Sequence, residues 1–219
     1  MAGVNRWHRK HSTQTPVEDS QLPKVSVIVC ARNEENNLHD YLHALLNQDY
    51  PCYEVIVIND GSEDNTQMIL EQYALQYKHL HITFVPREAR VISSKKLAIT
   101  IGIKAAQYDY LLLTDADCRP ESHQWIREMM NGFLPENNTI EVVLGYGAYF
   151  EKNTLLNSLI NYDTCFIGLQ YMGMAAAGHP YMGVGRNLAY KKTTFFKHDG
   201  FRGLLNERAG DDDLFINKV

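Results

Sequence analysis

Four apolar stretches in the first 130 residues alternate with segments of helical periodicity, and this alternation limits the fold more than any other feature. The stretches lie at 24–31, 53–59, 80–85 and 108–114 and are rich in β-branched residues or leucine. Near-continuous apolar strands of this kind are buried on both faces of a parallel sheet. Repeated strand–helix order builds such a sheet through right-handed crossovers. We therefore expect an α/β fold with a Rossmann-like, mostly parallel sheet flanked by helices.

The second half of the chain has a less regular pattern. Stretches at 141–150 and 187–191 have the composition of strands, and we expect them to complete a mixed sheet. The segment 155–177 is mostly apolar, with Asp163 as its single charge. We interpret it as a core helix followed by a loop, and the alternative is an amphipathic helix at a membrane surface.

Composition limits the partners and the compartment. Lysine and arginine number 21 against 26 aspartate and glutamate, and the resulting net charge of −5 argues against a nucleic-acid binder. The four cysteines have neither metal-ligand nor redox spacing, so we expect free thiols in a reducing, cytoplasmic compartment. The sequence contains no run of about 18 apolar residues that would span a bilayer.

The two ends of the chain carry further expectations. Residues 1–22 are polar and basic and lack periodicity, which predicts a flexible arm before a folded domain over 23–219. The chain stops at Val219, just after a helix signal has begun, and no glycine or proline follows. We therefore expect a fragment that is truncated at its C-terminus.

Polar residues follow three of the predicted strands, where parallel sheets bind ligands. Asp115 and Asp117 stand two residues apart at a strand end, so both carboxylates can approach one hard cation such as Mn²⁺ or Mg²⁺. Asp60 can accept hydrogen bonds from a ribose or a base. The alternatives are plain turns, with a capping aspartate in the first case and an Asx turn completed by Gly61 in the second.

Three further segments have polar patterns. Lys95 stands at the start of a predicted helix, where a lysine and the helix N-terminus together suit a phosphate, and a solvated basic turn is the alternative. The acidic run 211–213 exceeds what helix capping needs and offers a general base, and an acidic helix start is the alternative. The glycine-rich loop 183–187 lacks the full dinucleotide fingerprint, so we exclude NAD binding.

In their order, these segments resemble the family 2 glycosyltransferases, enzymes of the GT-A fold. The resemblance covers residues 24–219 and departs from the family pattern at Thr100, where asparagine is usual, and at Asp211, where glutamate is usual. It rests on the opening strand with its Asn-Glu turn at 25–35, Asn-Asp-Gly-Ser-Glu-Asp-Asn-Thr at 59–66, Lys-Lys-Leu-Ala at 95–98, Thr-Asp-Ala-Asp at 114–117, His-Asp-Gly-Phe at 198–201 and Gly-Asp-Asp at 210–212.

The resemblance implies an inverting transfer of a sugar from a nucleotide-sugar, most often a UDP-sugar, to an acceptor hydroxyl. A donor-binding half over about 23–130 and an acceptor half over about 131–219 would share this work. The product would be a cell-envelope polysaccharide or glycolipid, made from a sugar or lipid-linked acceptor. Membrane-associated members are common, which implies contact with the cytoplasmic face of a membrane. The alternative is a nucleotide-sugar-binding module that no longer catalyses.

The resemblance also assigns residues. Asp60 would bind the base, Lys95 the base or diphosphate, and Asp115 the ribose and diphosphate. Asp117, together with Asp115, would hold Mn²⁺ or Mg²⁺. The general base would be Asp212 if the alignment is anchored on the preceding glycine and Asp211 if it is anchored on the following leucine, and we take Asp212 first. The full donor set is Ala31, Arg32, Asn33, Glu34, Asp60, Lys95, Asp115, Ala116 and Asp117, and the acceptor side holds Gly185, Arg186, Asn187 and Asp213.

Overall fold

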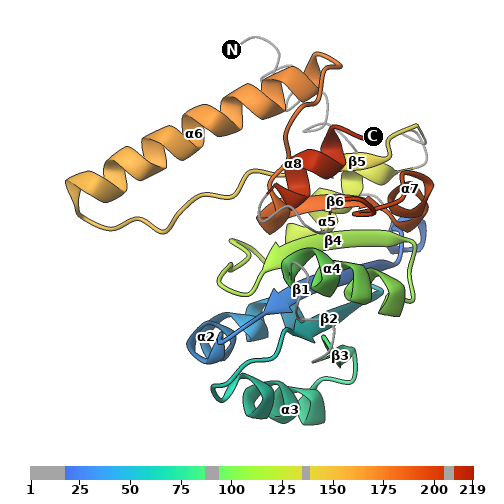
Figure 1. Ribbon diagram of the computed structural model, residues 1–219, viewed down its shortest axis with the longest axis vertical. Coiled ribbons are helices and arrows are strands. Elements are labelled where there is room, and N and C mark those ends of the chain that lie inside the picture. Colours follow the sequence, from blue (N-terminus) through green and yellow to red (C-terminus); the bar gives the residue numbers. More distant parts are fainter. Residues whose placement is uncertain (1–17, 87–93, 135–138, 205–209) are drawn as a thin grey trace.

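A computed structural model describes residues 18–86, 94–134, 139–204 and 210–219 (Figure 1). A six-stranded sheet in the order β3-β2-β1-β4-β6-β5 forms the centre. The strands are β1 (Val25–Ala31), β2 (Tyr53–Asn59), β3 (Leu80–Phe84), β4 (Tyr110–Asp115), β5 (Val142–Leu144) and β6 (Leu188–Lys191). The first four strands pair in parallel, whereas β6 runs antiparallel to both β4 and β5. The predicted α/β fold, with its mostly parallel sheet and mixed second half, is confirmed.

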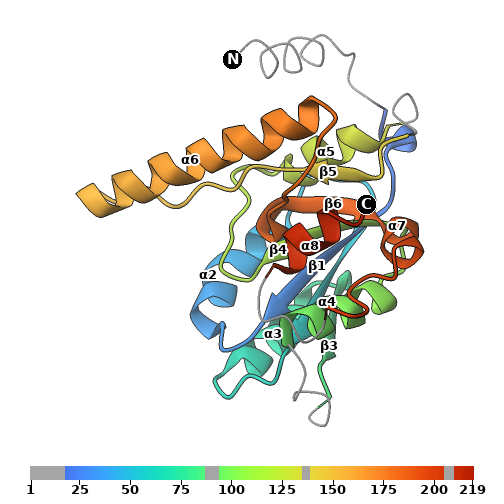
Figure 2. The ribbon, with the colours of Figure 1, turned by 45° about the horizontal axis from the view of Figure 1, so that its top comes forward.

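Helices cover both faces of this sheet (Figure 2). They are α2 (Glu35–Leu46), α3 (Thr66–Gln76), α4 (Ser94–Ala105), α5 (Trp125–Met130), α6 (Leu155–Ala176), α7 (Lys192–Lys197) and α8 (Asp211–Ile216), with 3₁₀ turns η1 (Asp19–Gln21), η3 (Asn131–Phe133) and η5 (Gly185–Asn187). Residues of α2, α3 and α5 pack on one face with Val27 and Val55. Residues of α4, α7 and α8 pack on the other face with Ile28 and Ile56. Since successive strand residues face opposite sides, a strand between two helix layers is mostly apolar, and the polar residues it contains need buried partners.

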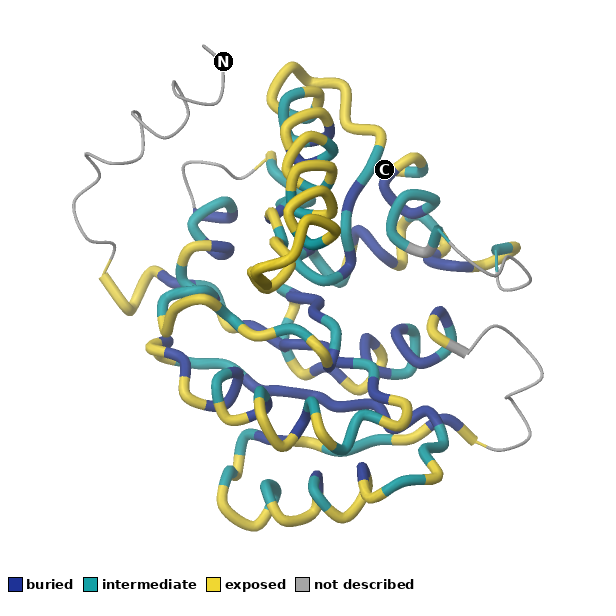
Figure 3. The backbone as a smooth tube through the Cα atoms, turned by 90° about the vertical axis from the view of Figure 1, so that its left-hand side faces the viewer, coloured by how far each residue is buried: buried dark blue, intermediate teal, exposed yellow. Residues whose placement is uncertain are grey.

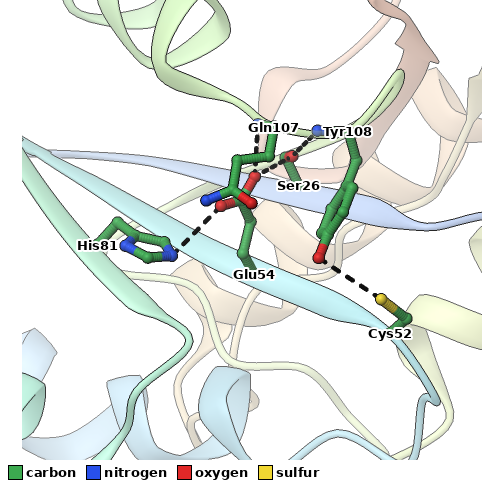
Figure 4. A network of polar contacts seen from close by, with 6 residues as sticks. All are labelled: Ser26, Cys52, Glu54, His81, Gln107 and Tyr108. Carbon is green, nitrogen blue, oxygen red and sulfur yellow. Dashed lines mark hydrogen bonds and ion pairs between the residues drawn. The ribbon is translucent and has the colours of Figure 1, made fainter.

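A buried polar network ties the amino-terminal ends of the strands together (Figure 4). Glu54 on β2 is 3% exposed, and its Oε1 accepts hydrogen bonds from Ser26 Oγ at 2.6 Å and Gln107 N at 2.7 Å. Ser26 Oγ accepts from Tyr108 N at 3.2 Å, and His81 Nε2 lies 3.4 Å from Glu54 Oε2. A buried carboxylate needs such partners because its desolvation is costly. The network holds residues 107 and 108, which lead into β4. It lies at the end of the sheet opposite the polar turns.

The strand predicted over 141–150 is much shorter in the structure. Only Val142–Leu144 pair with β6. Beyond them, Asn187 Nδ2 donates to the carbonyl of Tyr146 at 2.9 Å. A longer ladder would use the carbonyl of Gly145 and the N–H of Asn187. Gly145 O instead accepts from the hydroxyl of Tyr171, and the N–H of Asn187 donates to Val184 O at 2.9 Å, so the following residues run as irregular chain.

The apolar segment that begins at residue 155 is one helix of 22 residues, α6, which extends away from the sheet (Figures 1 and 3). Gly168 and Tyr171 are its only buried residues, while Leu155, Leu159 and Phe166 are 89%, 62% and 51% exposed. The interpretation as a core helix followed by a loop is therefore wrong. Apolar composition predicts a helix there, but what covers that helix depends on tertiary contacts that composition does not report. Within the described ranges, every helix falls short of the length or mean hydropathy that a membrane span requires.

Most of the arm predicted over 1–22 lies outside the described residues. Its last residues are placed against the domain. Asp19 Oδ1, in η1, lies 2.8 Å from Arg127 Nη2, and Leu22 is buried in the core on the α2 face.

Candidate active site

The loops after β1 and β2 are joined by hydrogen bonds between backbone and side chains. The N–H of Asn33 donates to Ser62 Oγ at 3.0 Å, and Asn33 Oδ1 accepts from the N–H of Glu63 at 2.8 Å. The N–H of Glu34 donates to Thr66 Oγ1 at 2.9 Å. Asn33 has a φ of 56°, a left-handed conformation that asparagine adopts more readily than most residues. The two predicted donor turns therefore form one hydrogen-bonded wall.

Asp64 fastens this wall to the helices behind it. Its carboxylate accepts from the N–H of Glu35 at 3.1 Å and from the N–H of Thr66 at 3.0 Å, so it serves the first turns of both α2 and α3. Desolvation acts to raise the pKa of Asp64, but the hydrogen bonds from Thr66 and Glu35 outweigh it and hold the pKa below its ordinary value. The charged form of Asp64 therefore stabilises the junction of the two loops.

Asp60 stands directly after β2 and is 5% exposed. Its N–H donates to Ala31 O at 2.9 Å, which places it beside the end of β1, where Arg32 is exposed. Asp60 Oδ1 is buried and lacks a hydrogen-bond partner within the described part of the chain. An unpartnered buried carboxylate oxygen is costly. An N–H or O–H group of a ligand would therefore bind favourably to this oxygen. Contact with a nucleobase requires such an unoccupied acceptor.

Two carboxylates and a thiol gather at the end of β4. One ligand atom each from Asp115, Asp117 and Cys118 lies within 4.8 Å of the others, and Ala116 between the two aspartates is buried. Lys95 Nζ, from the start of α4, lies 3.0 Å from Asp115 Oδ1. Burial raises the pKa of the Cys118 thiol to about 12, and Asp117 and Asp115 add to the rise. The carboxylates of Asp115 and Asp117 are the hard oxygen donors of this group and fit a cation such as Mn²⁺ or Mg²⁺, whereas a thiol suits softer metals.

Acidic residues of α8 reach the glycine-rich loop before β6. The N–H of Gly185 donates to Asp212 Oδ2 at 2.6 Å, and the N–H of Gly183 donates to Asp213 Oδ1 at 3.3 Å. A Cβ on Gly185 would lie only 2.4 Å from Asp212 Oδ1. Glycine at this position therefore lets the carboxylate approach the loop backbone. The side chain of Asp211, the other candidate base, lies outside the described residues.

A cavity of about 10 Å³ lies where the two halves of the domain meet. Its lining includes Lys95 and Asp115 from the predicted donor half and Gly185 and Asp212 from the predicted acceptor half. This volume holds roughly one water molecule. The structure therefore brings a candidate general base, Asp212, and a candidate diphosphate contact, Lys95, to one cavity, although the two residues lie far apart along the sequence.

A much larger cleft of about 1080 Å³ opens beside Asp115 and Asp117. Arg186 and Asn187 of η5 line it, and Trp125 Nε1 fixes Asn187 by donating to its Oδ1 at 3.0 Å. Other lining residues include Cys118, Arg119, Glu121, Glu128, Tyr146, Gly147, Tyr149, Phe150, Glu151, Asn161 and Cys165. The predicted donor residues Ala31, Arg32, Asn33, Glu34 and Asp60 line neither this cleft nor the small cavity and form a separate wall.

Sequence reasoning missed several residues that shape this site. Ser62 and Thr66 link the two donor loops, Trp125 orients Asn187, and segment 146–151 walls the cleft. Each acts through a partner that is distant along the chain, 62 positions away for Trp125. The sequence does point to Ser62 and Thr66, because they lie in the 59–66 motif. Trp125 and segment 146–151 belong to no motif.

Residues 26–207 match the family described as glycosyl transferase family 2. Among curated proteins, the probable glycosyltransferase YdaM of Bacillus subtilis is 30% identical over 67% of this chain and 35% of its own length. The poly-beta-1,6-N-acetyl-D-glucosamine synthase of Staphylococcus epidermidis is 37% identical over 46% of this chain and 23% of its own length. The chain thus spans 35% or less of the length of these two relatives.

Solved structures share the fold over most of the chain. The mannosyltransferase PcManGT of Pyrobaculum calidifontis, in complex with GDP-Man and Mn²⁺, has a TM-score of 0.64 at 21% identity and covers 96% of this chain and 56% of its own. S. aureus TarS 1–349 in complex with UDP-GlcNAc has a TM-score of 0.57 at 20% identity and covers 89% of this chain and 52% of its own. These neighbours identify the fold as GT-A.

Proposed function

The chain belongs to glycosyl transferase family 2, and we propose that it is the catalytic domain of an inverting enzyme that moves a sugar from a UDP-sugar to an acceptor hydroxyl. The observation that carries this proposal is the small cavity lined by Lys95, Asp115 and Asp212. Direct displacement needs a base and diphosphate-binding groups held around one reacting carbon. The TarS neighbour is in complex with UDP-GlcNAc, which supports a UDP-sugar as the donor.

In this proposal the donor lies across the half of the domain over about 23–130. The unpartnered Oδ1 of Asp60 accepts from the base, beside the turn at 31–34. Lys95 and Asp115 approach the diphosphate, and Asp117 with Asp115 would hold the metal ion. Bound Mn²⁺ or Mg²⁺ would supply neutralisation of the charge on the leaving diphosphate. The complex of PcManGT with GDP-Man and Mn²⁺ supports this assignment.

The chain's own residues carry the transfer. Asp212 takes the proton of the acceptor hydroxyl as the acceptor oxygen forms its bond to the anomeric carbon. The bond from that carbon to the diphosphate oxygen breaks with its electron pair, and Lys95 stabilises the charge that develops there. Attack from the side opposite the leaving group inverts the anomeric carbon. The N–H of Gly185 orients the Asp212 carboxylate for this step.

We place the acceptor in the half over about 131–219, next to Gly185, Arg186, Asn187 and Asp213. The product is a cell-envelope polysaccharide or glycolipid, and the partial match to the poly-beta-1,6-N-acetyl-D-glucosamine synthase supports this class. The exposed apolar surface of α6 contacts the cytoplasmic face of a membrane and brings a sugar or lipid-linked acceptor to the cleft. Co-sedimentation with phosphatidylcholine vesicles tests this contact. We expect binding that falls in the double variant Leu159→Ser, Phe166→Ser, and an intact chain that ignores vesicles contradicts it.

Asp212→Asn separates catalysis from binding. It removes the base while nearly preserving side-chain volume, so transfer in a donor-sugar screen should fall by at least about 10²-fold. The affinity for UDP, measured by calorimetry, should stay within about twofold because Asp212 contacts the acceptor side. Asp109→Asn, at an exposed position that lines neither the small cavity nor the cleft, is the matched control.

Three other outcomes are informative. Loss of transfer in Asp211→Asn but not in Asp212→Asn would move the base to Asp211. Full transfer in both variants would overturn the base assignment. A wild-type chain that binds UDP but transfers no sugar from any donor would instead indicate an inactive nucleotide-sugar-binding module.

A further inference from the structure

Resting on the proposed function, we propose that the acceptor carries a phosphate group and that Arg186, assisted by Arg119, binds it in the cleft beside Asp117. This inference deepens the proposed function by naming a chemical class for the acceptor. It rests on the position of Arg186, on the hydrogen-bonding capacity that Arg186 leaves unused, and on the charges around it.

Arg186 is the residue next to the contact between the loop and the candidate base. It follows Gly185, whose N–H binds Asp212, so the Arg186 side chain starts close to the place where the acceptor hydroxyl must lie. The Arg186 guanidinium carbon lies 4.9 Å from the centroid of the Tyr149 ring. Stacking on an aromatic face holds a guanidinium in one orientation and leaves its in-plane N–H groups available.

The polar capacity of Arg186 is not satisfied inside the protein. Its Nε is buried and has no hydrogen-bond partner among the described residues. The ion pairs formed within those residues do not include Arg186. A buried donor without a partner is costly, and a guanidinium presents its donors in a fork that matches two oxygens of a phosphate. An anion bound here would satisfy both the hydrogen bonds and the charge.

The chain makes room for this arginine. A Cβ on Gly147 would lie 2.7 Å from Arg186 Nε. The side chain at position 147 is therefore limited to a hydrogen atom if Arg186 is to keep its place over Tyr149. This close approach also provides a variant that displaces the guanidinium without removing its charge.

Arg119 adds a second positive charge to the same cleft. Its guanidinium carbon lies 5.3 Å from the centroid of the Phe150 ring, the residue after Tyr149. The cleft also contains five carboxylates. Asp115 is paired with Lys95, Asp117 would hold the metal ion in the proposed function, and Glu121, Glu128 and Glu151 are exposed and therefore screened by water. The half-buried charge of Arg186 is screened less. Two guanidinium groups suit a phosphate monoester, which carries close to two negative charges at neutral pH.

The donor diphosphate has other partners in the proposed mechanism. Lys95 and the aspartates at the end of β4 lie on the donor side, and Lys95 Nζ is already 3.0 Å from Asp115 Oδ1. Arg186 belongs to η5, in the half of the domain to which we assign the acceptor, and the preceding residue Gly185 contacts Asp212. Assigning Arg186 to the acceptor therefore predicts that its loss leaves donor binding intact.

Calorimetric titration of the chain, saturated with UDP and Mg²⁺, tests the proposal with two probes, inorganic phosphate and hexyl phosphate. We expect both probes to bind the wild-type chain. Arg186→Gln should weaken them by about 10-fold or more, and Arg119→Gln should have a smaller effect because Arg119 is exposed. Arg186→Lys should fall between wild type and Arg186→Gln, since lysine keeps the charge but loses the fork. Arg202→Gln, an exposed arginine outside the cleft, is the matched control.

The two probes and a second variant make the outcomes decisive. Tighter binding of hexyl phosphate than of inorganic phosphate would assign the group to a lipid phosphate, and equal binding would assign it to a polar phosphate ester. If Arg186→Gln melts early, Gly147→Ala provides the same test with the arginine retained, and weaker phosphate binding is expected. Phosphate binding that is absent, or that is unchanged in Arg186→Gln, overturns this proposal. If the chain still binds UDP in that case, the proposed function is unaffected. An equal loss of UDP affinity in Arg186→Gln would also overturn it, because Arg186 would then serve the donor.

Discussion

The half of the domain to which we assign the donor and the half to which we assign the acceptor are built in different ways. In the donor half, four parallel strands lie between two helix layers, and side chains of one loop bind the backbone of the next, as Ser62 does for Asn33. In the acceptor half the strands are short and the site residues sit on a 3₁₀ turn and the six-residue helix α8. The longest helix, α6, leaves most of its surface exposed.

This difference predicts a division between stability and function. Buried groups of the donor half support the fold, so changing them should lower the free energy of unfolding. The exposed part of the acceptor half has few such contacts, so changing it should leave stability intact. Asp60 is the informative exception there, because its buried Oδ1 has no hydrogen-bond partner among the described residues.

The largest effect is expected at Glu54. In Glu54→Leu the N–H of Gln107 and the hydroxyl of Ser26 lose their buried partner. We expect the free energy of unfolding to fall by about 3 kcal/mol or more, measured by urea denaturation. Glu128→Gln, at an exposed position of the cleft, should change it by less than about 0.5 kcal/mol. An equal loss of the free energy of unfolding in the two variants would contradict the proposed difference between the two halves.

A smaller effect, on binding instead of stability, is expected at Asp60. Asp60→Asn keeps the shape of the side chain but removes the charge of the unpartnered carboxylate. We expect the affinity for UDP to fall by about 10-fold in calorimetry, since a hydrogen bond to a charged group is lost. The melting temperature should not fall, because Oδ1 forms no hydrogen bond with the part of the chain that the structure describes. Asp109→Asn, at an exposed position before β4, is the control, and a lowered melting temperature with normal UDP affinity would contradict the role of Asp60.

The smallest effects compare the two sides of α6. The hydroxyl of Tyr171, buried at 2% exposure, donates to Gly145 O at 2.8 Å. Tyr171→Phe should lower the free energy of unfolding by about 1 kcal/mol. Leu159→Gln, on the exposed side of the helix, should change it by less than about 0.5 kcal/mol. A large loss of the free energy of unfolding in Leu159→Gln would show that another surface covers this side of α6 in solution.

The sequence predicts the donor half well because its signals are local. Apolar stretches end in polar turns, and parallel strands bring those turns to one end of the sheet, so strand order alone predicts that Asp60 and Asp115 lie at the same end, on either side of β1. The contact between Gly185 and Asp212 joins residues 27 positions apart and depends on how α8 packs, which no spacing reports. The family resemblance names these residues, but only the structure shows Asp212 against the loop backbone.

The exposure of α6 could not be predicted for a related reason. A helix of mostly apolar residues has the same composition in a core and on a surface, and the difference lies in the neighbours. The same holds for Arg186, which the sequence places on the acceptor side but not over Tyr149. Tertiary packing determines both outcomes.

The most direct test of the proposed donor site is a calorimetric titration of the chain with UDP, with and without Mn²⁺, beside Asp117→Ala. Glu121→Gln, an exposed acidic residue of the same cleft, is the matched control. We expect binding that requires Mn²⁺, falls by at least about 10-fold in Asp117→Ala, and persists in Glu121→Gln. UDP binding that is absent, or that is the same without metal and in Asp117→Ala, would contradict the assignment of the donor site to the end of β4.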